Sequence, residues 1–386
     1  MSSEIPCLFI AVHAGAGSHA KANDHIYKSI CKKACQQAMS LLQAKGSALE
    51  GVTAAVSVLE NDEITNCGKG SSLTVQGTVE CDACVMDGSS LLFGAVGALC
   101  GVANPVTIAC RLVDEQKLGP LPYGRIRPSI LVGRGAQDYC AEHGIEIHNN
   151  LVTGDAWNKF LHYSKKCRNS GKSLIASRKR KNDLSEESFS LESKELKECR
   201  SGPRDDSVQD TVGAICVDHD GNVAAASSSG GIWLKHSGRL GPCAIYGAGC
   251  WAQNQISETK PGVAAVTSGC GEHLMMTLLA KNSSDSIRSS DNIGQSLVAA
   301  FKDHFLESEF LKLYQEKFGA VLILRTLLSD STREIELSWI HSTESMCLGY
   351  MAGKDKAPTV TMSRLEDWSK PGQSFSVGGH VIVGQT

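Results

Sequence analysis

The chain has 386 residues, of which 42% are hydrophobic and 20% are charged, a composition typical of a globular protein. Its 38 Lys and Arg residues nearly balance its 41 Asp and Glu residues, so the overall charge gives no reason to expect nucleic acid or an anionic membrane as a partner. Sixteen cysteines, with no secretory signal visible at the start, indicate reduced thiols in the nucleus or cytoplasm rather than a disulfide framework.

The N-terminal residues predict a buried strand followed by two helices. The strand is expected over residues 9–12, and the first helix begins at about Asp24 and stops at Gly46. Ser47 and Glu50 form a capping-box pattern that opens the second helix. Because both helices are amphipathic and adjacent, we expect them to pack as one layer. Their apolar stripes consist of Ile26, Ile30, Ala34 and Ala38 in the first helix and Val52, Val56 and Leu59 in the second.

The uncharged run over residues 88–110 is long enough to cross a membrane, but it contains several glycines and a proline. We expect a buried strand there, followed by a helix with Asn104 as its N-cap and Pro105 as its first residue. No membrane-spanning segment is therefore expected.

Residues 165–210 differ in composition from the rest of the chain. They include 12 Lys and Arg residues, are more than twice as charged as the chain as a whole, and contain only 10 hydrophobic residues. Such a segment buries little surface, so we expect a linker that is mobile or only partly helical. Its basic run over residues 178–181 is either a solvated charge cluster or a nuclear localisation element.

After the linker the sequence predicts mainly strands. Residues 211–217 and 222–226 are β-prone runs joined by an Asp-Gly turn, which is typical of a hairpin. Three later apolar runs are expected to be further strands of an antiparallel sheet: residues 320–328, 335–340 and 346–351. Helices cluster and strands cluster along the chain, which favours a layered α+β fold over a doubly wound parallel sheet.

Common signatures of other kinds of site are incomplete or missing. The glycines at 15 and 17 and at 68 and 70 lack the remaining spacing of a phosphate-binding loop. Cys81 and Cys84 have zinc-like spacing, but no second Cys/His pair lies at a suitable distance, so core packing is the favoured interpretation. The HExxH motif of metalloproteases and the GxSxG motif of serine hydrolases are absent.

The charged linker ends at Asp210-Thr211, where a β-prone run begins. Thr211 would become a nucleophile only if its own α-amine were freed, because an α-amine with a pKa of about 8 could then accept the hydroxyl proton. One cut between these two residues would thus create both a nucleophile and its base. On these residues alone, the alternative that Thr211 is an ordinary β-branched residue at the start of a strand stays open.

Several motifs resemble those of the N-terminal-nucleophile asparaginase family and occur in the same order. Upstream of Thr211 the matching segments are residues 13–17 (HAGAG), 66–70 (NCGKG) and 81–88 (CDACVMDG). Downstream they are residues 209–214 (QDTVGA), 225–231 (AASSSGG), 235–241 (KHSGRLG) and 267–272 (TSGCGE). The resemblance implies a four-layer αββα sandwich in which residues 1–386 form one domain.

Within this family, residues 268–273 (SGCGEH) and 341–347 (HSTESMC) are most similar to the threonine aspartases, endopeptidases that cut after Asp. Amino-acid-hydrolysing relatives have an Asp after their Arg-Val-Gly motif that holds the free ammonium group of the substrate, and Pro242 occupies that place here. A substrate whose amine is already in a peptide bond needs no such partner, so Pro242 fits an endopeptidase.

The resemblance also implies roles for individual residues. It implies self-cleavage between Asp210 and Thr211, giving an α-subunit of residues 1–210 and a β-subunit of residues 211–386. Thr211 would then attack the carbonyl after a substrate Asp, whose carboxylate Arg239 would hold. The other implied site residues are Ser229, which orients Thr211, Ser268 and Gly269, which stabilise the oxyanion, and Asn66 as a neighbour of that site. No cofactor or metal is implied.

The same resemblance implies protein substrates among nuclear chromatin and transcription regulators, and a nuclear and cytoplasmic location. It also implies an αβ heterodimer that could assemble as an (αβ)2 dimer, with no direct binding of nucleic acid. The main alternative is an asparaginase or isoaspartyl peptidase on the same fold. An inactive scaffold that binds partners through its basic linker is a further alternative.

Overall fold

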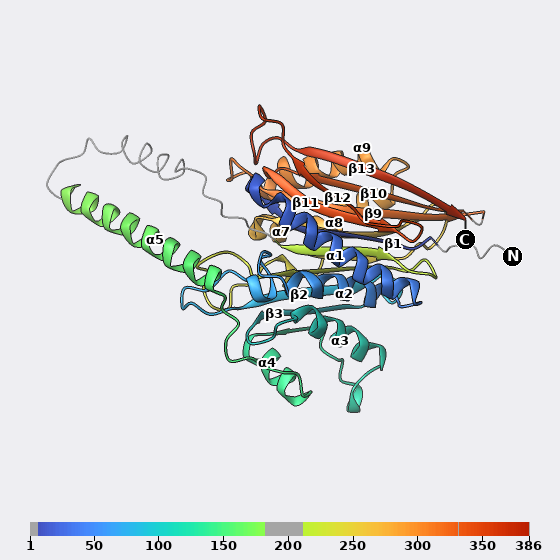
Figure 1. Cartoon of the computed structure of the whole chain (residues 1–386), viewed down its shortest axis with the longest axis horizontal. Coiled ribbons are helices and arrows are strands. Elements are labelled where there is room, and N and C mark those ends of the chain that lie inside the picture. The colour runs from blue at the N-terminus through green and yellow to red at the C-terminus, as the bar shows by residue number, and fades with distance from the viewer. Residues whose placement is uncertain (1–6, 182–210, 331, 386) are drawn as a thin grey trace.

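The computed structural model describes residues 7–181, 211–330 and 332–385, with the backbone alone described at 169–181, 384 and 385. Two β-sheets lie face to face, and helices cover both outer faces (Figure 1). This arrangement is a four-layer αββα sandwich, and the predicted α+β fold is confirmed.

The first sheet has eight strands and is antiparallel except for its β3–β4 pair. Its strands in spatial order are β12 (Thr359–Arg364), β11 (Ser345–Ala352), β1 (Phe9–Gly17), β5 (Val212–Val217), β6 (Val223–Ser229), β2 (Cys81–Asp87), β3 (Phe93–Leu99) and β4 (Ile130–Val132). The second sheet has five antiparallel strands. In order these are β13 (Ser376–Gln385), β10 (Thr332–His341), β9 (Gly319–Ser329), β8 (Gly262–Gly269) and β7 (Cys250–Gln253).

Different helices cover the two sheets. The helices on the first sheet are α1 (Asp24–Gln43), α2 (Ala48–Glu60) and α3 (Pro105–Lys117), and those on the second are α8 (Leu279–Arg288) and α9 (Ile293–Phe301). The other α-helices among the described residues are α4 (Gly133–Glu142), α5 (Gly154–Lys181) and α7 (Gly271–Thr277). Short helical turns are η1 (Lys21–Asn23), η2 (Gly68–Gly70), η3 (Pro122–Gly124), η4 (Pro242–Ala244), η5 (Lys302–Leu306) and η6 (Glu309–Leu311).

Two large hydrophobic clusters hold the sandwich together. Along β1, Phe9 and Ala11 belong to the layer between the sheets, whereas Ile10 and Val12 pack beneath α1 and α2. Successive side chains of a strand point to opposite faces, and both faces of this strand are buried. That double burial explains why β1 is continuously apolar instead of alternating.

The predicted helix starts are confirmed. Ser47 caps α2 with the reciprocal hydrogen bonds of a capping box with Glu50, and α3 begins at Pro105 as expected. Asn104 occupies the N-cap position, but its side chain makes no capping hydrogen bond and donates instead to the Ser57 carbonyl and the Glu60 carboxylate. One member of the predicted α1 stripe is wrong, since Ile26 is 37% exposed and the neighbouring Tyr27 is buried instead.

The predicted strands are confirmed, but not as neighbours in one sheet. Residues 211–217 and 222–226 form the β5–β6 hairpin, and residues 320–328 and 335–340 form β9 and β10 of the second sheet. Residues 346–351 form β11, which pairs with β1 in the first sheet. The chain crosses from one sheet to the other between His341 and Ser345.

The charged segment begins inside a helix, as expected for a partly helical linker. α5 continues to Lys181 and extends away from the sandwich (Figure 1). Its first turns are attached to the body, because the ring of Tyr163 stacks on that of Trp233 with centroids 4.1 Å apart. Residues 182–210 lie outside the described part of the chain. Among the described helices, none is long and apolar enough to cross a membrane.

Candidate active site

The candidate nucleophile Thr211 is the first described residue after α5 and directly precedes β5. β5 lies between β1 and β6 in the first sheet, and Thr211 is 4% exposed. Its hydroxyl donates a hydrogen bond to Ser229 Oγ at 3.2 Å. The hairpin register explains this contact. Val212 lies opposite Ser228 in the antiparallel pair, so Thr211, which precedes Val212, lies close to Ser229, which follows Ser228. Asp210, on the other side of the predicted cut, lies outside the described residues.

Ser229 ends β6 and is buried. Its hydroxyl oxygen accepts a second hydrogen bond, from the backbone N–H of Gly231 at 3.0 Å. Gly231 has φ +66°, a left-handed conformation that glycine adopts at little cost, and this turn brings its N–H back to Ser229. The Ser229 hydroxyl is therefore held in place as the partner of the Thr211 hydroxyl.

Asn66 supports the loop that follows Ser229. Its side-chain amide donates to the Gly231 carbonyl at 2.7 Å, and its backbone carbonyl accepts from Gly230 at 2.7 Å. Its Oδ1 accepts from the Ser72 N–H at 2.8 Å. Asn66 thus contacts the site through Gly231, and its hydrogen bonds go to backbone groups rather than to Thr211.

A buried lysine lies behind the same loop, and the sequence motifs predicted no role for it. Lys235 is 3% exposed, and its ammonium donates to the backbone carbonyls of Ser72, Glu80 and Gly230. Burial lowers the pKa of this ammonium, while the surrounding acidic groups act in the opposite direction. Lys235 thereby connects three parts of the chain beside the site, at Ser72, Glu80 and Gly230.

Arg239 reaches the same loop from the next turn of the chain. An ideal Cβ placed on Gly231 would lie 3.1 Å from Arg239 Nη1, so the guanidinium lies directly against the residue that contacts Ser229. Its Nε and Nη2 donate to Glu272 Oε1 at 3.0 and 2.8 Å. The Arg239 side chain is 14% exposed and that of Glu272 is 46% exposed, so the pair lies at the rim of the site.

Ser268 and Gly269 end β8, in the second sheet. β8 packs against β5, where an ideal Cβ on Gly213 would lie 2.8 Å from Val266 Cβ. Gly269 has φ +132°, which a side chain rarely tolerates, and this conformation leads the chain into α7. The Ser268 hydroxyl accepts from the Ala16 N–H at 3.1 Å, so its hydrogen bond goes to the end of β1 and not to Thr211.

Two buried titratable groups lie beside Thr211. Burial lowers the pKa of His13 to about 3, while a hydrogen bond with the Thr211 backbone acts in the opposite direction, so the imidazole is neutral at physiological pH. Burial has the opposite effect on a thiol: it raises the pKa of Cys243, which lies near Thr211 and Ser227. The raised pKa keeps the Cys243 thiol protonated at physiological pH.

The two cysteines with zinc-like spacing contact different groups. Cys81 Sγ lies 3.1 Å from Ser71 Oγ, whereas Cys84 Sγ lies 3.4 Å from Cys250 Sγ across the two sheets. Within the described ranges, no group of three or more His, Cys, Asp or Glu side chains could hold a metal ion.

The sequence is similar to known hydrolases over most of its length. A family model described as asparaginase matches residues 6–361. An isoaspartyl peptidase/L-asparaginase from Xenopus laevis is 34% identical over 273 residues, which cover 70% of this chain and 73% of the relative. An isoaspartyl peptidase from Escherichia coli is 33% identical over 70% of this chain and 74% of its own length. A plant-type L-asparaginase from Pyrococcus horikoshii is 32% identical over 72% of this chain and 79% of its own. The chain therefore belongs to the asparaginase family of N-terminal-nucleophile hydrolases.

Proposed function

We propose that this hydrolase is a threonine endopeptidase that first cleaves itself between Asp210 and Thr211 and then cleaves protein substrates after Asp. The buried Thr211–Ser229 hydroxyl pair supports the nucleophile, and Arg239 beside Gly231 supports the recognition of an acidic side chain.

In the self-cleavage step, Thr211 Oγ1 attacks the carbonyl carbon of Asp210, and the acyl group moves from the threonine nitrogen to its oxygen. Water then hydrolyses the ester, which leaves a carboxylate on Asp210 and a free α-amine on Thr211. The Ser229 hydroxyl is positioned to orient the attacking oxygen because it already binds the Thr211 hydroxyl.

In the substrate reaction, the freed α-amine of Thr211 accepts the hydroxyl proton as the oxygen attacks the carbonyl after the substrate Asp. The same amine returns the proton to the leaving nitrogen, and water resolves the acyl-enzyme. Ser268 and Gly269 are proposed to stabilise the oxyanion. In that role one hydrogen-bond donor lowers the activation barrier by about 3 kcal/mol. Arg239 is proposed to bind the carboxylate of the substrate Asp.

The observation that favours an endopeptidase is the surroundings of Arg239. Pro242 is buried at the start of η4, and an ideal Cβ on Gly271 would lie 2.6 Å from Arg239 Nη2 and 3.0 Å from Pro242 Cδ. Pro242 thus lies beside the proposed carboxylate-binding group, at the position where the resemblance to amino-acid-hydrolysing members of the family leads us to expect an Asp. A proline offers no charge to the ammonium group of a free amino acid.

An asparaginase or isoaspartyl peptidase is the second candidate, and the names of the relatives favour it. The relatives matched at 32–34% identity are named as isoaspartyl peptidases or asparaginases. In addition, the half-exposed carboxylate of Glu272 lies beside Arg239 and supplies a negative charge at the rim of the site.

A denaturing gel tests the self-cleavage step. We expect the purified chain to give bands of 210 and 176 residues, with Thr211 as the N-terminus of the smaller one. Thr211→Ala should give one intact band, because the attacking oxygen is gone. A different new N-terminus, or two bands from the variant, would contradict the mechanism.

Substrate assays separate the two candidates. We expect cleavage of a quenched peptide with an internal Asp-Gly bond and no release of aspartate from L-asparagine or a β-aspartyl dipeptide. Pro242→Asp should weaken peptide cleavage and introduce hydrolysis of free amino-acid substrates, while Pro242→Ala serves as the control for loss of the ring. Turnover of L-asparagine by the unaltered protein, without peptide cleavage, would favour the second candidate.

The cellular partners belong to the same proposal. Substrates that are nuclear proteins, and assembly of the two subunits as an αβ or (αβ)2 particle, are consistent with an endopeptidase of this family. The basic run at residues 178–181, whose side chains lie outside the described part, is proposed as the nuclear localisation element.

A further inference from the structure

Two buried carboxylates lie next to the loop that carries Arg239, and no step of the proposed mechanism uses them. Glu80 directly precedes β2 and is 6% exposed, and Asp82 is the second residue of β2 and is 4% exposed. Both residues come from the part of the chain upstream of Thr211, whereas Arg239 lies downstream of it.

The hydrogen bonds of the two carboxylates enclose Arg239 on both sides. Glu80 Oε1 accepts from Ser237 Oγ at 2.5 Å, and its Oε2 accepts from the Gly238 N–H at 2.8 Å. Asp82 Oδ2 accepts from the Gly241 N–H at 2.6 Å. The two residues before Arg239 and the second residue after it are therefore held by acidic side chains.

The same two carboxylates are connected to the rest of the site. The backbone carbonyl of Glu80 accepts from Lys235 Nζ at 2.7 Å, and Asp82 Oδ1 accepts from the Ala98 N–H at 2.8 Å. An ideal Cβ on Gly241 would lie 3.2 Å from Asp82 Oδ2 and 2.9 Å from Arg239 Nη1, so carboxylate and guanidinium line the same small space.

Burying these carboxylates is costly, and the cost is visible at Asp82. Burial raises the pKa of Asp82, and the hydrogen bonds from Ala98 and Gly241, together with the charges of Lys235 and Arg239, only partly compensate. A buried charge is tolerated when its geometry is well satisfied, and here that geometry fixes a loop.

We propose that Glu80 and Asp82 are positioning residues that aim Arg239 at the carboxylate of the substrate. The inference rests on the proposed function, because it takes Arg239 to bind the acidic side chain of the substrate. Recognition of Asp then depends on both halves of the processed chain, since the upstream half holds the arginine that the downstream half supplies.

Asp82→Asn and Glu80→Gln test the proposal. Each change leaves one acceptor oxygen in place of two without a change of side-chain size. In Asp82→Asn the new NH2 group faces one of the two backbone N–H donors, Ala98 or Gly241, and in Glu80→Gln the bonds to Ser237 and Gly238 lose their charge, so the loop is held less firmly. For a peptide with an internal Asp we expect KM to rise about 10- to 100-fold, with kcat changed by about twofold or less.

Selectivity distinguishes a positioning role from a structural one. We expect the preference for an Asp peptide over the same peptide with Asn to fall in both variants, because only the Asp peptide uses the aimed guanidinium. Ser237→Ala, at an exposed position, should lower the same preference by about two- to tenfold without disturbing the core. Equal losses on both peptides, or an unchanged preference at an unchanged melting temperature, would overturn the proposal.

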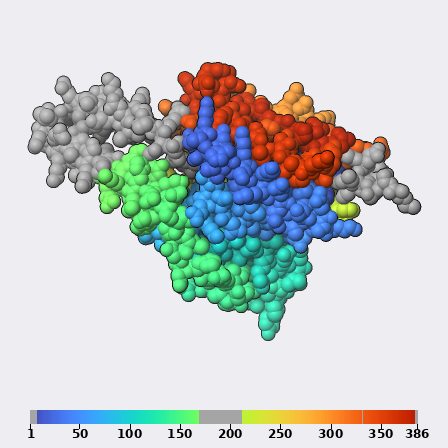
Figure 2. Space-filling model, in the orientation of Figure 1, coloured from blue at the N-terminus to red at the C-terminus, as the bar shows by residue number. Residues whose placement is uncertain are grey.

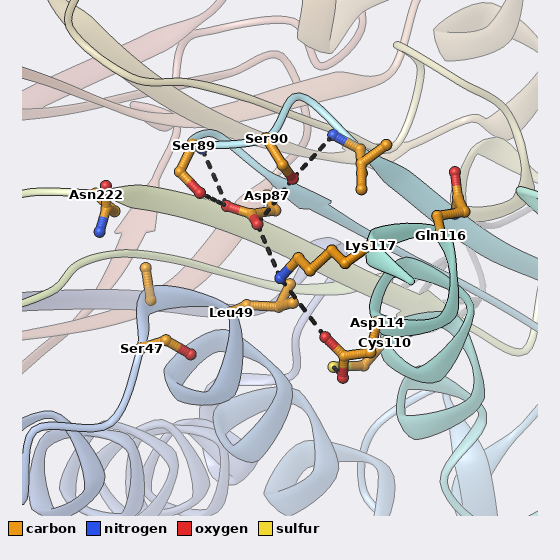
Figure 3. Close-up of polar contacts among 12 residues, drawn as sticks. Ser47, Leu49, Asp87, Ser89, Ser90, Cys110, Asp114, Gln116, Lys117 and Asn222 are labelled. Carbon is orange, nitrogen blue, oxygen red and sulfur yellow. Dashed lines mark hydrogen bonds and ion pairs between the residues drawn. The ribbon is translucent and has the colours of Figure 1, made fainter. Parts of the chain in front are cut away.

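The matched control lies at the other end of the same strand. Asp87 is 6% exposed, and its carboxylate accepts hydrogen bonds from Ser89 and Ser90 and forms a 3.0 Å ion pair with Lys117 (Figure 3). Asp87→Asn therefore removes a buried carboxylate of β2 that has no contact with the loop of Arg239. We expect it to lower the melting temperature while leaving KM and the Asp preference unchanged.

Stabilisation by N-acetyl-L-aspartate, whose amine is acylated as it is in a peptide, separates failure of this inference from failure of the proposed function. We expect N-acetyl-L-aspartate to raise the melting temperature of the unaltered protein and of Asp87→Asn, and to have a smaller effect on Asp82→Asn and none on Arg239→Ala. If no peptide is cleaved but this order is found, the proposed function fails and the positioning role stands. If no peptide is cleaved and N-acetyl-L-aspartate gives equal shifts in all four proteins, or none, the positioning role fails too.

Discussion

Glu60 is a fully buried carboxyl at the end of α2, and burial raises its pKa to about 8, against the opposing hydrogen bonds of Ser228, Val106 and Asn104. Between the usual value of 4.5 and this value, the folded chain keeps a proton that the unfolded chain has released. Stability from this group is therefore complete below about pH 4.5 and is lost as the pH rises toward 8.

We expect Glu60→Gln to remove this dependence. The free energy of unfolding of the unaltered protein should fall by roughly 5 kcal/mol relative to the variant between about pH 4.5 and 8, at about 1.4 kcal/mol per pKa unit. Denaturant unfolding of both proteins at pH 5, 6.5 and 8 measures the difference. Buried histidines such as His13 titrate in the same way in both proteins, so their contributions cancel in the difference between the two unfolding free energies. If the two unfolding free energies changed in parallel with pH, Glu60 would be ionised in the folded protein, contrary to this prediction.

Gly269 offers a second test at the scale of a residue. An added Cβ would lie 2.5 Å from the Phe318 carbonyl oxygen, and φ is +132°. We expect Gly269→Ala to lower the free energy of unfolding by about 1–3 kcal/mol and to impair turnover, because the turn next to Ser268 must move.

Gly294→Ala is the control for Gly269→Ala. Gly294 lies in α9, its nearest atom to an added Cβ is Asn292 Oδ1 at 3.7 Å, and its φ is ordinary. Alanine has the higher helix propensity, so denaturant unfolding should show equal or greater stability. Equal stability of the Gly269→Ala protein and the parent would contradict the strain at this turn.

Among the elements, α2 depends on a cap that the sequence already shows. The Ser47 hydroxyl accepts from the Glu50 N–H at 3.3 Å, and a Glu50 carboxylate oxygen accepts from the Ser47 N–H at 2.8 Å. We expect Ser47→Ala to cost about 1 kcal/mol of stability. Ser40→Ala, in the exposed interior of α1, should cost nothing, and thermal melts of both variants measure the contrast.

Helix starts were predictable because they depend on neighbouring residues. Ser47 with Glu50 and Asn104 with Pro105 are local signals, and each opens a helix where expected. The start of α5 was not predicted, since its attachment depends on the stack of Tyr163 on Trp233, 70 residues later in the chain.

The choice of strand partners could not be predicted from local sequence. The run at residues 346–351 has the same apolar character as its predecessors, yet it pairs with β1, more than 300 residues earlier. Strand pairing over such a distance depends on the packing of the complete sandwich, and local sequence does not contain that information.

The candidate site was predicted as a set of residues but not as a set of contacts. The motifs identified Thr211, Ser229 and Arg239, and the structure brings these three together around Gly231. The motifs gave no role to Lys235 or Asp82, because the hydrogen-bond partners of these buried groups are distant in sequence. Lys235 donates to the Glu80 carbonyl, and Asp82 accepts from the Gly241 N–H.

At the scale of the whole molecule, strands from the two sides of Thr211 alternate within the first sheet. β1 lies between β11 and β5, and β2 lies beside β6, so three ladders join upstream strands to downstream ones. Helix α1 also packs on β11 and β12, and in Figure 2 the N-terminal residues in blue lie directly against the C-terminal residues in red.

We therefore expect the two fragments of the cleaved chain to stay together. They should elute as one peak from a size-exclusion column in native buffer, at the volume of uncut Thr211→Ala, and separate only in denaturant. Two peaks in native buffer would contradict this expectation. The physical reason is that separation would expose three rows of backbone hydrogen-bonding groups and the apolar faces of β1 and β5.

The alternation of strands also changes the molecularity of folding. In the uncut chain, β1 meets β5 and β11 within one polypeptide, whereas after the proposed cut the same ladders form only when two separate polypeptides associate. Association costs translational entropy, so we expect the refolding yield of the cleaved form to fall on dilution, while that of uncut Thr211→Ala stays independent of concentration. The proposed self-cleavage would in this way turn a unimolecular folding reaction into a bimolecular one.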